Sequence, residues 1–250
     1  MMTKLNGSYR EVTLKNGLHV MLQNTPTQTI SGKLRVNFGA LNEQPGEEGL
    51  AHFLEHTLMT GGSTKYSPEE SDHVRGTFGS HNAFTGLDET FFPVDMLSED
   101  LASYLDFVSD ITFNPRLDNT RFEEERQRVL RETSDAKSDP EFKDNQAYQN
   151  AFFGDESPHT YFILGNEDVI HSVTPEQMKE FQARGYGAAN MDLILVGNLP
   201  DDVEELVHQN FGDKPTGENT KFQFPKNPNL ESRTLIHTSA PELYNQDQPQ

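Results

Sequence analysis

Strand-like and helix-like patterns in this chain come in groups instead of alternating one by one. Alternating apolar residues, or short β-branched and aromatic runs, predict strands at 10–14, 18–22, 32–38, 81–95, 191–196 and 235–237. Apolar residues at helical spacing, with capping and stop signals, predict helices that begin near residues 50, 68, 101, 119, 140, 175 and 203. Strands in pairs with runs of helices between them favour an α+β fold, with helices packed on one face of an antiparallel or mixed sheet.

The composition limits the class of partner. Forty acidic residues face twenty basic ones in the 250-residue chain, giving a formal net charge of −20, which argues against nucleic-acid binding through phosphate neutralisation. This acidity is typical of a solvated surface, and it also suits an acidic chamber that attracts basic substrates, so both interpretations stay open. The chain has no cysteine, which excludes disulfide scaffolds, cysteine metal ligands and cysteine nucleophiles.

Nothing in the sequence indicates a membrane or an export route. The longest apolar runs, such as 193–196, are far shorter than a membrane span. Residues 1–6 contain neither the apolar core of a signal peptide nor an Arg-rich amphipathic presequence. We therefore expect a cytoplasmic protein without membrane contact.

The pentamer His52-Phe53-Leu54-Glu55-His56 carries the strongest chemical signal. On a helix the two imidazoles lie about 40° apart and Glu55 lies about 60° to the other side, so all three share one face. Two histidines at this spacing can hold one divalent ion, and the carboxylate beside them can take a proton from an attacking water. The alternative is an amphipathic helix in which the two histidines occur by chance.

A catalytic zinc site needs a third protein ligand. The charged segment 123–132 offers Glu125 and Glu132, which are seven residues apart and therefore fall on one helix face. Either side chain could point at the metal. The alternative is a solvated helix with ion pairs such as Glu124–Arg128, and spacing alone does not decide between them.

His-x-x-Glu-His is the inverted zincin motif, and the residues around it resemble the pitrilysin/insulinase family of metallopeptidases, which includes the mitochondrial processing peptidases. The resemblance covers about residues 8–215. The matching stretches are 16–20, 49–56, 80–85 with 89–92, 125–132, 174–181 and 190–198. S-ribosylhomocysteine lyase has a similar fold and motif but completes its metal site with cysteine, which this chain lacks.

The resemblance implies a role for each matching residue. His52, His56 and Glu132 would ligate one zinc ion, Glu55 would be the general base, and Glu125 would be an acid beside the site that orients a ligand. The separation of 76 residues between His56 and Glu132 suits the family.

The same resemblance implies a substrate-binding strand. Asn82 and Ala83 would lie on an edge strand that pairs with an extended peptide, and main-chain pairing would permit many substrate sequences. We expect the neighbouring Phe84 to be part of the core instead.

Members of the family that this chain resembles usually carry two homologous domains, fused or as paired subunits, that close like a clamshell around the peptide. We expect residues 1–235 to form one catalytic half-clamshell domain, and residues 236–250 to be a tail or the start of a junction to a second domain. The expected partners are a peptide substrate and a second homologous domain or subunit, or another copy of the chain.

The sequence thus predicts a zinc-dependent endopeptidase domain acting on extended or unfolded peptides. Two alternatives remain open. One is a non-catalytic relative that serves as a scaffold or peptide-binding subunit, although such relatives typically lose ligands or the base. The other is an isolated catalytic half that binds zinc and needs a partner domain for activity.

Overall fold

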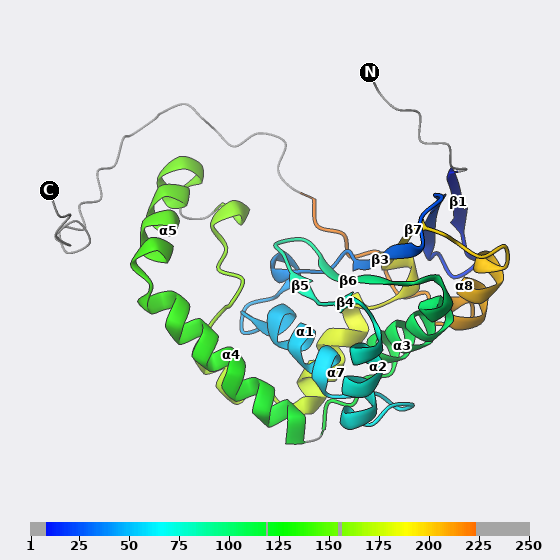
Figure 1. Ribbon diagram of the computed structural model, residues 1–250. Coiled ribbons are helices and arrows are strands. Elements are labelled where there is room, and N and C mark those ends of the chain that lie inside the picture. Colours follow the sequence, from blue (N-terminus) through cyan, green and yellow to red (C-terminus); the bar gives the residue numbers. More distant parts are fainter. Residues whose placement is uncertain (1–8, 119, 155–156, 224–250) are drawn as a thin grey trace, which may run out of the picture.

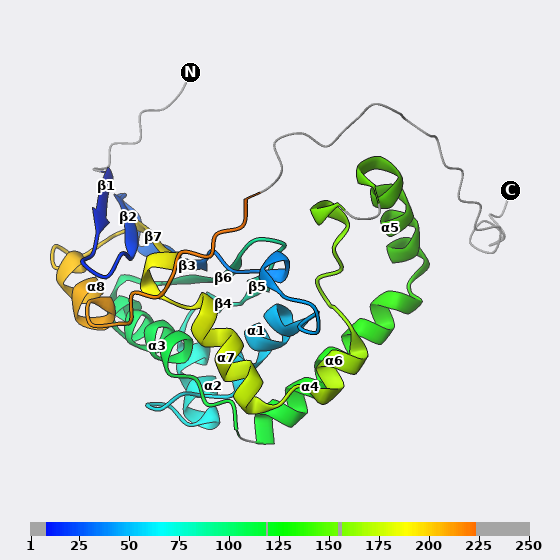
Figure 2. The same cartoon turned by 180° about the vertical axis from the view of Figure 1, so that it is seen from behind.

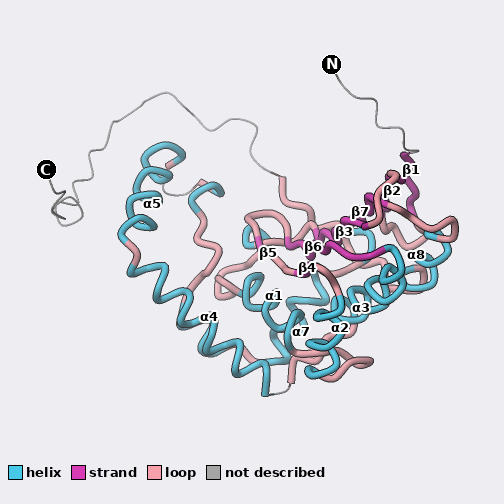
Figure 3. The backbone as a smooth tube through the Cα atoms, in the orientation of Figure 1, coloured by secondary structure: helices cyan, strands magenta, loops and turns pink. Residues whose placement is uncertain are grey.

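The computed structural model describes residues 9–118, 120–154 and 157–223, and these residues contain one mixed sheet. The strand order is β1-β2-β7-β3-β6-β4, with β5 also paired to β6 (Figures 1 and 3). Strands β2 and β7 are parallel and all the other pairs are antiparallel. The strands are β1 Tyr9–Thr13, β2 His19–Asn24, β3 Thr29–Val36, β4 Ser80–His81, β5 Phe84–Thr85, β6 Thr90–Leu97 and β7 Met191–Gly197.

One face of this sheet forms the core. In β3, every second residue is buried, namely Ile30, Gly32, Leu34 and Val36, whereas the residues between them are exposed or half-buried. Strands β6 and β7 alternate in the same way. Because successive side chains of a strand point to opposite faces, this pattern places all the buried side chains on one side of the sheet.

The helical layer covers that buried face (Figures 1 and 2). Its helices are α1 Leu50–Thr60, α2 Pro68–Thr77, α3 Leu101–Phe113, α7 Pro175–Gly185 and α8 Val203–Phe211. The Phe38 ring, just after β3, meets Phe181 of α7 at 5.0 Å between centroids. The predicted α+β class, with a mixed sheet and helices on one face, is confirmed.

Helices α4 Thr120–Ser138 and α5 Pro140–Phe153 extend along one side of this body (Figure 1). The start of α4 is fixed by buried Arg126, which donates to the carbonyls of Ile170 and Val173 at the end of α6 Glu167–Ser172. Helix α5 begins at the cap Asp139 and has no buried residue. We call residues 139–154 and 157–166, which comprise α5 and the described segment after it, the arm.

Several predicted boundaries are wrong in the described residues. The expected strand 81–95 is three strands, because the chain turns at 86–89, where the Gly86 amide donates to the Glu89 carbonyl at 2.7 Å. Helix α6 was not predicted; it has only six residues, which is too short for a periodic signal. The predicted strand 32–38 begins and ends earlier, as β3. The predicted strand 235–237 and the tail 236–250 lie outside the described residues.

In the described part of the chain, no helix is both long and apolar enough to cross a bilayer.

A half-buried histidine in β4, whose two ring nitrogens are buried, predicts acid sensitivity. Neither ring nitrogen of His81 has a hydrogen-bond partner among the described residues, and the ring lies 5.8 Å from those of Phe78 and Phe107. Burial, with a smaller effect from Arg75, lowers the pKa of His81 from 6.5 to about 4. As the pH falls below 6.5, the unfolded chain therefore takes up the proton before the folded chain does.

We expect His81 to reduce the free energy of unfolding by up to about 3 kcal/mol as the pH falls from 6.5 to about 4. His81→Phe should remove that part of the pH dependence, whereas the matched change His73→Phe, on exposed α2, should retain it. Denaturant unfolding at a series of pH values measures both slopes. Equal slopes in the two variants would contradict the assignment.

Candidate metal centre

Helix α1 positions the pentamer. Its apolar side chains, including Phe53, Leu54 and Leu58, are buried in the core. His52 and His56 lie on the side of the helix that faces α4, and each is half-buried. The Phe53 ring meets Phe122 of α4 at 4.8 Å, which fixes the distance between these two helices. The sequence pattern therefore puts one face of α1 in the core and aims the histidines at α4.

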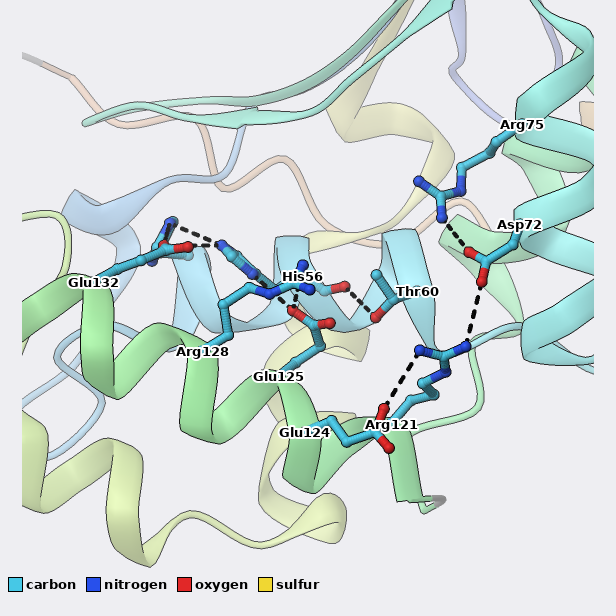
Figure 4. Close-up of polar contacts among 10 residues, drawn as sticks. His56, Thr60, Asp72, Arg75, Arg121, Glu124, Glu125, Arg128 and Glu132 are labelled. Carbon is cyan, nitrogen blue, oxygen red and sulfur yellow. Dashed lines mark hydrogen bonds and ion pairs between the residues drawn. The ribbon is translucent and has the colours of Figure 1, made fainter.

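Three side chains converge between these helices. The Nε2 atoms of His52 and His56 are 3.2 Å apart. The Oε2 atom of Glu132, from α4, lies 3.4 Å from the Nε2 atom of His56 (Figure 4). The same Oε2 atom lies 3.7 Å from the Nε2 atom of His52. A tetrahedral zinc ion with bonds of about 2.0–2.1 Å separates its ligand atoms by about 3.3 Å. The donor set and its spacing therefore fit one zinc ion, with a fourth position left for water or substrate.

The protonation of His52 suits this arrangement. Burial, together with the neighbouring His56, lowers the pKa of His52 to about 3. A neutral imidazole has a lone pair available for a metal, so burial leaves the His52 ring able to bind one at neutral pH.

Glu125 does not join the three converging ligand atoms. Its Oε2 atom lies 3.0 Å from Nδ1 of His56, on the side of the ring away from Glu132, and its side chain is almost fully buried. Arg128 Nη1 lies 3.4 Å from the same carboxylate oxygen (Figure 4). The two alternatives left by spacing are thus separated: Glu132 faces the ligand atoms and Glu125 holds the back of one imidazole. The suggested Glu124–Arg128 ion pair is wrong, since Glu124 pairs with Arg121.

Glu125→Gln should weaken zinc binding about 10–100-fold without abolishing it, because the amide offers His56 a weaker acceptor. Competition with a chromophoric chelator measures the affinity. Glu124→Gln, on the exposed side of the same helix, is the matched control and should bind like the parent. An unchanged affinity in Glu125→Gln would contradict an orienting role.

Glu55 is buried beside the histidines and receives a hydrogen bond from Thr85 Oγ1 at 2.8 Å. Burial raises its pKa, although the Thr85 hydrogen bond and the charge of His56 oppose the shift. A carboxylate with a raised pKa is a better proton acceptor, which is the property that a general base needs. Sequence reasoning missed Thr85, since its contact with Glu55 spans thirty residues and leaves no local pattern.

A cavity of about 640 Å³ opens beside these groups. Its lining includes His52, Glu55 and His56 from α1, residues 82–85 and 87 from the β4–β6 region, and arm residues such as Phe142, Tyr161 and Phe162. Asn82 is exposed and Ala83 is buried, and both line this cavity. Glu55 is the only acidic residue among the described residues that line this cavity.

Phe84 is not a core residue, which corrects the sequence-based expectation. Its side chain is 48% exposed, lines the cavity and stacks on Phe91 at 5.2 Å. The reason is that β5 has only two residues, and Phe84 pairs there with Phe91 on the open face of the sheet.

The fold and the site together define a metallopeptidase-like domain of the His-x-x-Glu-His class. A family model described as Insulinase (Peptidase family M16) matches residues 19–158. The chain belongs to this family. A second model, described as Peptidase M16 inactive domain, matches residues 172–250.

Individual relatives agree with this assignment. An uncharacterized zinc protease of Rickettsia bellii (strain RML369-C) is 31% identical over 235 residues, which is 89% of this chain and 56% of the relative. The mitochondrial-processing peptidase subunit beta of Dictyostelium discoideum is 29% identical over 208 residues, which is 82% of this chain and 44% of the relative. The chain therefore spans about half the length of these curated relatives.

A solved structure shows the same fold. The first half of the periplasmic protease PqqL from Escherichia coli aligns with a TM-score of 0.79 at 24% identity, covering 88% of this chain and 49% of that chain. The likeness supports the fold alone.

Proposed function

We propose that this chain is the catalytic domain of a zinc endopeptidase that cleaves extended or unfolded peptides. The observation that carries the proposal is the convergence of His52, His56 and Glu132, whose ligand atoms all lie within 4.8 Å of one another, with Glu55 beside them. The family and its zinc-protease relatives make zinc the metal of choice.

Each group then has a task. When bound, zinc lowers the pKa of water at its open position towards 7 and polarises a carbonyl group. Glu55 accepts the proton of the attacking water and passes it to the departing amine, while Thr85 holds the carboxylate in place. Glu125 fixes the ring of His56 through Nδ1, which leaves Nε2 for the metal.

One edge of the sheet offers a place where a substrate peptide would pair as an additional strand. Strands β4 and β5 both pair with β6, whose other neighbour is β3, so they form one edge of the described sheet. Asn82 and Ala83 join these two short strands beside Glu55, at the wall of the cavity. A peptide paired to this edge would place its scissile bond next to the metal, with main-chain contacts that accept many sequences.

Turnover is proposed to require a second half. The chain spans about half of its curated relatives, so a second homologous domain or subunit, or another copy of this chain, would close over the peptide. The isolated catalytic half is therefore the second candidate. The cytoplasmic location also stays a prediction.

The test is a cleavage assay of the zinc-loaded chain on unfolded peptides, alone and with a candidate second half. Cleavage that stops with a chelator and returns with zinc would support the proposal. Cleavage only in the presence of the second half would identify an isolated catalytic half. Zinc binding without cleavage under either condition would favour the scaffold function.

A further inference from the structure

Helix α1, which carries His52 and His56 and which we call the metal helix, begins without a capping side chain of its own. Its N-cap residue is Gly49, at φ +97°, and it offers no side-chain acceptor to the first turn. Glu43 supplies that acceptor from outside the helix. Its Oε1 atom accepts from the amide of Ala51 at 2.8 Å, and its Oε2 atom accepts from the amide of Gly49 at 3.0 Å. A carboxylate at a helix N-terminus is also favoured by the helix dipole.

The same carboxylate binds the wall of the cavity. Tyr161 donates its hydroxyl to Oε2 of Glu43 at 2.9 Å, and Tyr161 lines the cavity beside His52 and Glu55. One side chain therefore contacts both the start of the metal helix, directly before His52, and the arm segment that lines the cavity.

Backbone contacts place the arm segment against the same loop. The amide of Asn166 donates to the carbonyl of Glu48 at 3.0 Å. Gly165 adopts φ +73°, and a Cβ atom there would lie 2.2 Å from the amide nitrogen of Gly49, so only glycine permits this approach. We call these backbone contacts, together with the Tyr161–Glu43 hydrogen bond, the junction. The hydrogen bond is the part of the junction that reaches the cavity.

The rest of the arm depends on this segment. Phe162 packs against Phe142 of α5 at 5.0 Å, and His159 against Phe153 at 4.6 Å. Since α5 has no buried residue, its position relative to the body is set by α4 and by this segment.

We propose that Glu43 is a positioning residue that joins the metal helix to the arm through Tyr161, and that this junction sets the width of the peptide-binding cavity. The identity of the ligand rests on the proposed function, whereas the junction itself does not. Burial raises the pKa of Glu43 to about 7, against the opposing effect of its hydrogen bonds to Ala51, Gly49 and Tyr161. The carboxyl thus occupies a site that is unfavourable for its charge and depends on these three donors.

Tyr161→Phe removes only the hydroxyl and is the sharpest test. Tyr66→Phe is the matched control, because Tyr66 also donates to a carboxylate, that of Asp106, away from the cavity. Hydrogen exchange of peptides covering residues 157–166 should be several-fold faster in Tyr161→Phe and unchanged in Tyr66→Phe. This readout needs neither zinc nor turnover, so it separates failure of the junction from failure of the proposed function.

Peptide binding gives the functional readout. In chains that also carry Glu55→Gln, a fluorescein-labelled extended peptide should bind about tenfold more weakly when Tyr161→Phe is added, with zinc affinity unchanged. Glu43→Gln should weaken both peptide binding and zinc affinity about tenfold, because the amide has only one acceptor oxygen and cannot accept from both Ala51 and Gly49 at the start of α1. Where the second half restores turnover, Tyr161→Phe should raise KM and leave kcat nearly unchanged.

Exchange rates and peptide affinity equal to the parent in Tyr161→Phe would overturn the proposal. Equal losses in Tyr66→Phe would also overturn it, because they would show a general effect of removing a hydroxyl.

Discussion

Glu132→Gln is expected to reduce bound zinc from about one ion per chain to almost none. Of the three converging ligands, Glu132 is the only one that carries a negative charge, and its carboxylate lies within 3.7 Å of both imidazoles. A neutral amide oxygen is a much weaker zinc ligand, and two histidines alone leave the ion without the three protein ligands of a catalytic site. Elemental analysis of the purified, zinc-treated chain gives the stoichiometry.

Glu124→Gln is the matched control for this experiment, since it makes the same chemical change on the same helix at an exposed residue paired with Arg121. It should keep the parental zinc content. If Glu132→Gln also kept it, the third ligand would have to be another acid beside the histidines, either Glu125 or Glu55. Little zinc in the parent itself would mean that the ligands do not converge without a second half.

The local part of the site could be predicted from the sequence. Helical spacing alone places His52, Glu55 and His56 on one face, and the three residues do lie on one helix in the structure, α1 Leu50–Thr60. The third ligand was beyond this reasoning, since helical geometry puts Glu125 and Glu132 on the same face. Only the resemblance favoured Glu132. The structure separates the two acids, because Oε2 of Glu132 lies 3.4 Å from Nε2 of His56 whereas Oε2 of Glu125 lies 3.0 Å from Nδ1 of the same ring.

The remaining parts of the cavity depend on tertiary contacts that leave no periodic signal. Thr85 and Tyr161 contact carboxylates thirty and 118 residues away. Phe84 belongs to a two-residue strand, and two residues are too few for an alternating pattern to show whether Phe84 points to the core or to the open face of the sheet. The sheet and the helical layer were predictable because their apolar faces repeat over several residues, whereas the walls of the cavity are made of single side chains from short segments.

All the groups proposed for metal binding and proton transfer come from α1 and α4 of this one chain. Metal binding can therefore be measured on the chain alone, even if a second half is needed to hold the peptide. A variant that lacks the base and retains the metal can therefore be examined in this chain, and metal binding can be tested independently of any second half.

Glu55→Gln should keep the zinc content of the parent and lose peptide cleavage by at least about 100-fold, the usual contribution of a general base. Glutamine retains the size of the side chain and can still accept the hydrogen bond from Thr85, but it cannot take a proton from water. The measurement pairs elemental analysis with the cleavage assay, with the second half added where the parent requires it.

Glu124→Gln again serves as the control and should cleave like the parent. Because Glu55 lies beside the ligands without being one of the three that converge, loss of cleavage with zinc retained would separate proton transfer from metal binding. Full activity in Glu55→Gln would remove Glu55 as the base, whereas loss of zinc would make Glu55 a ligand and contradict the separation of proton transfer from metal binding.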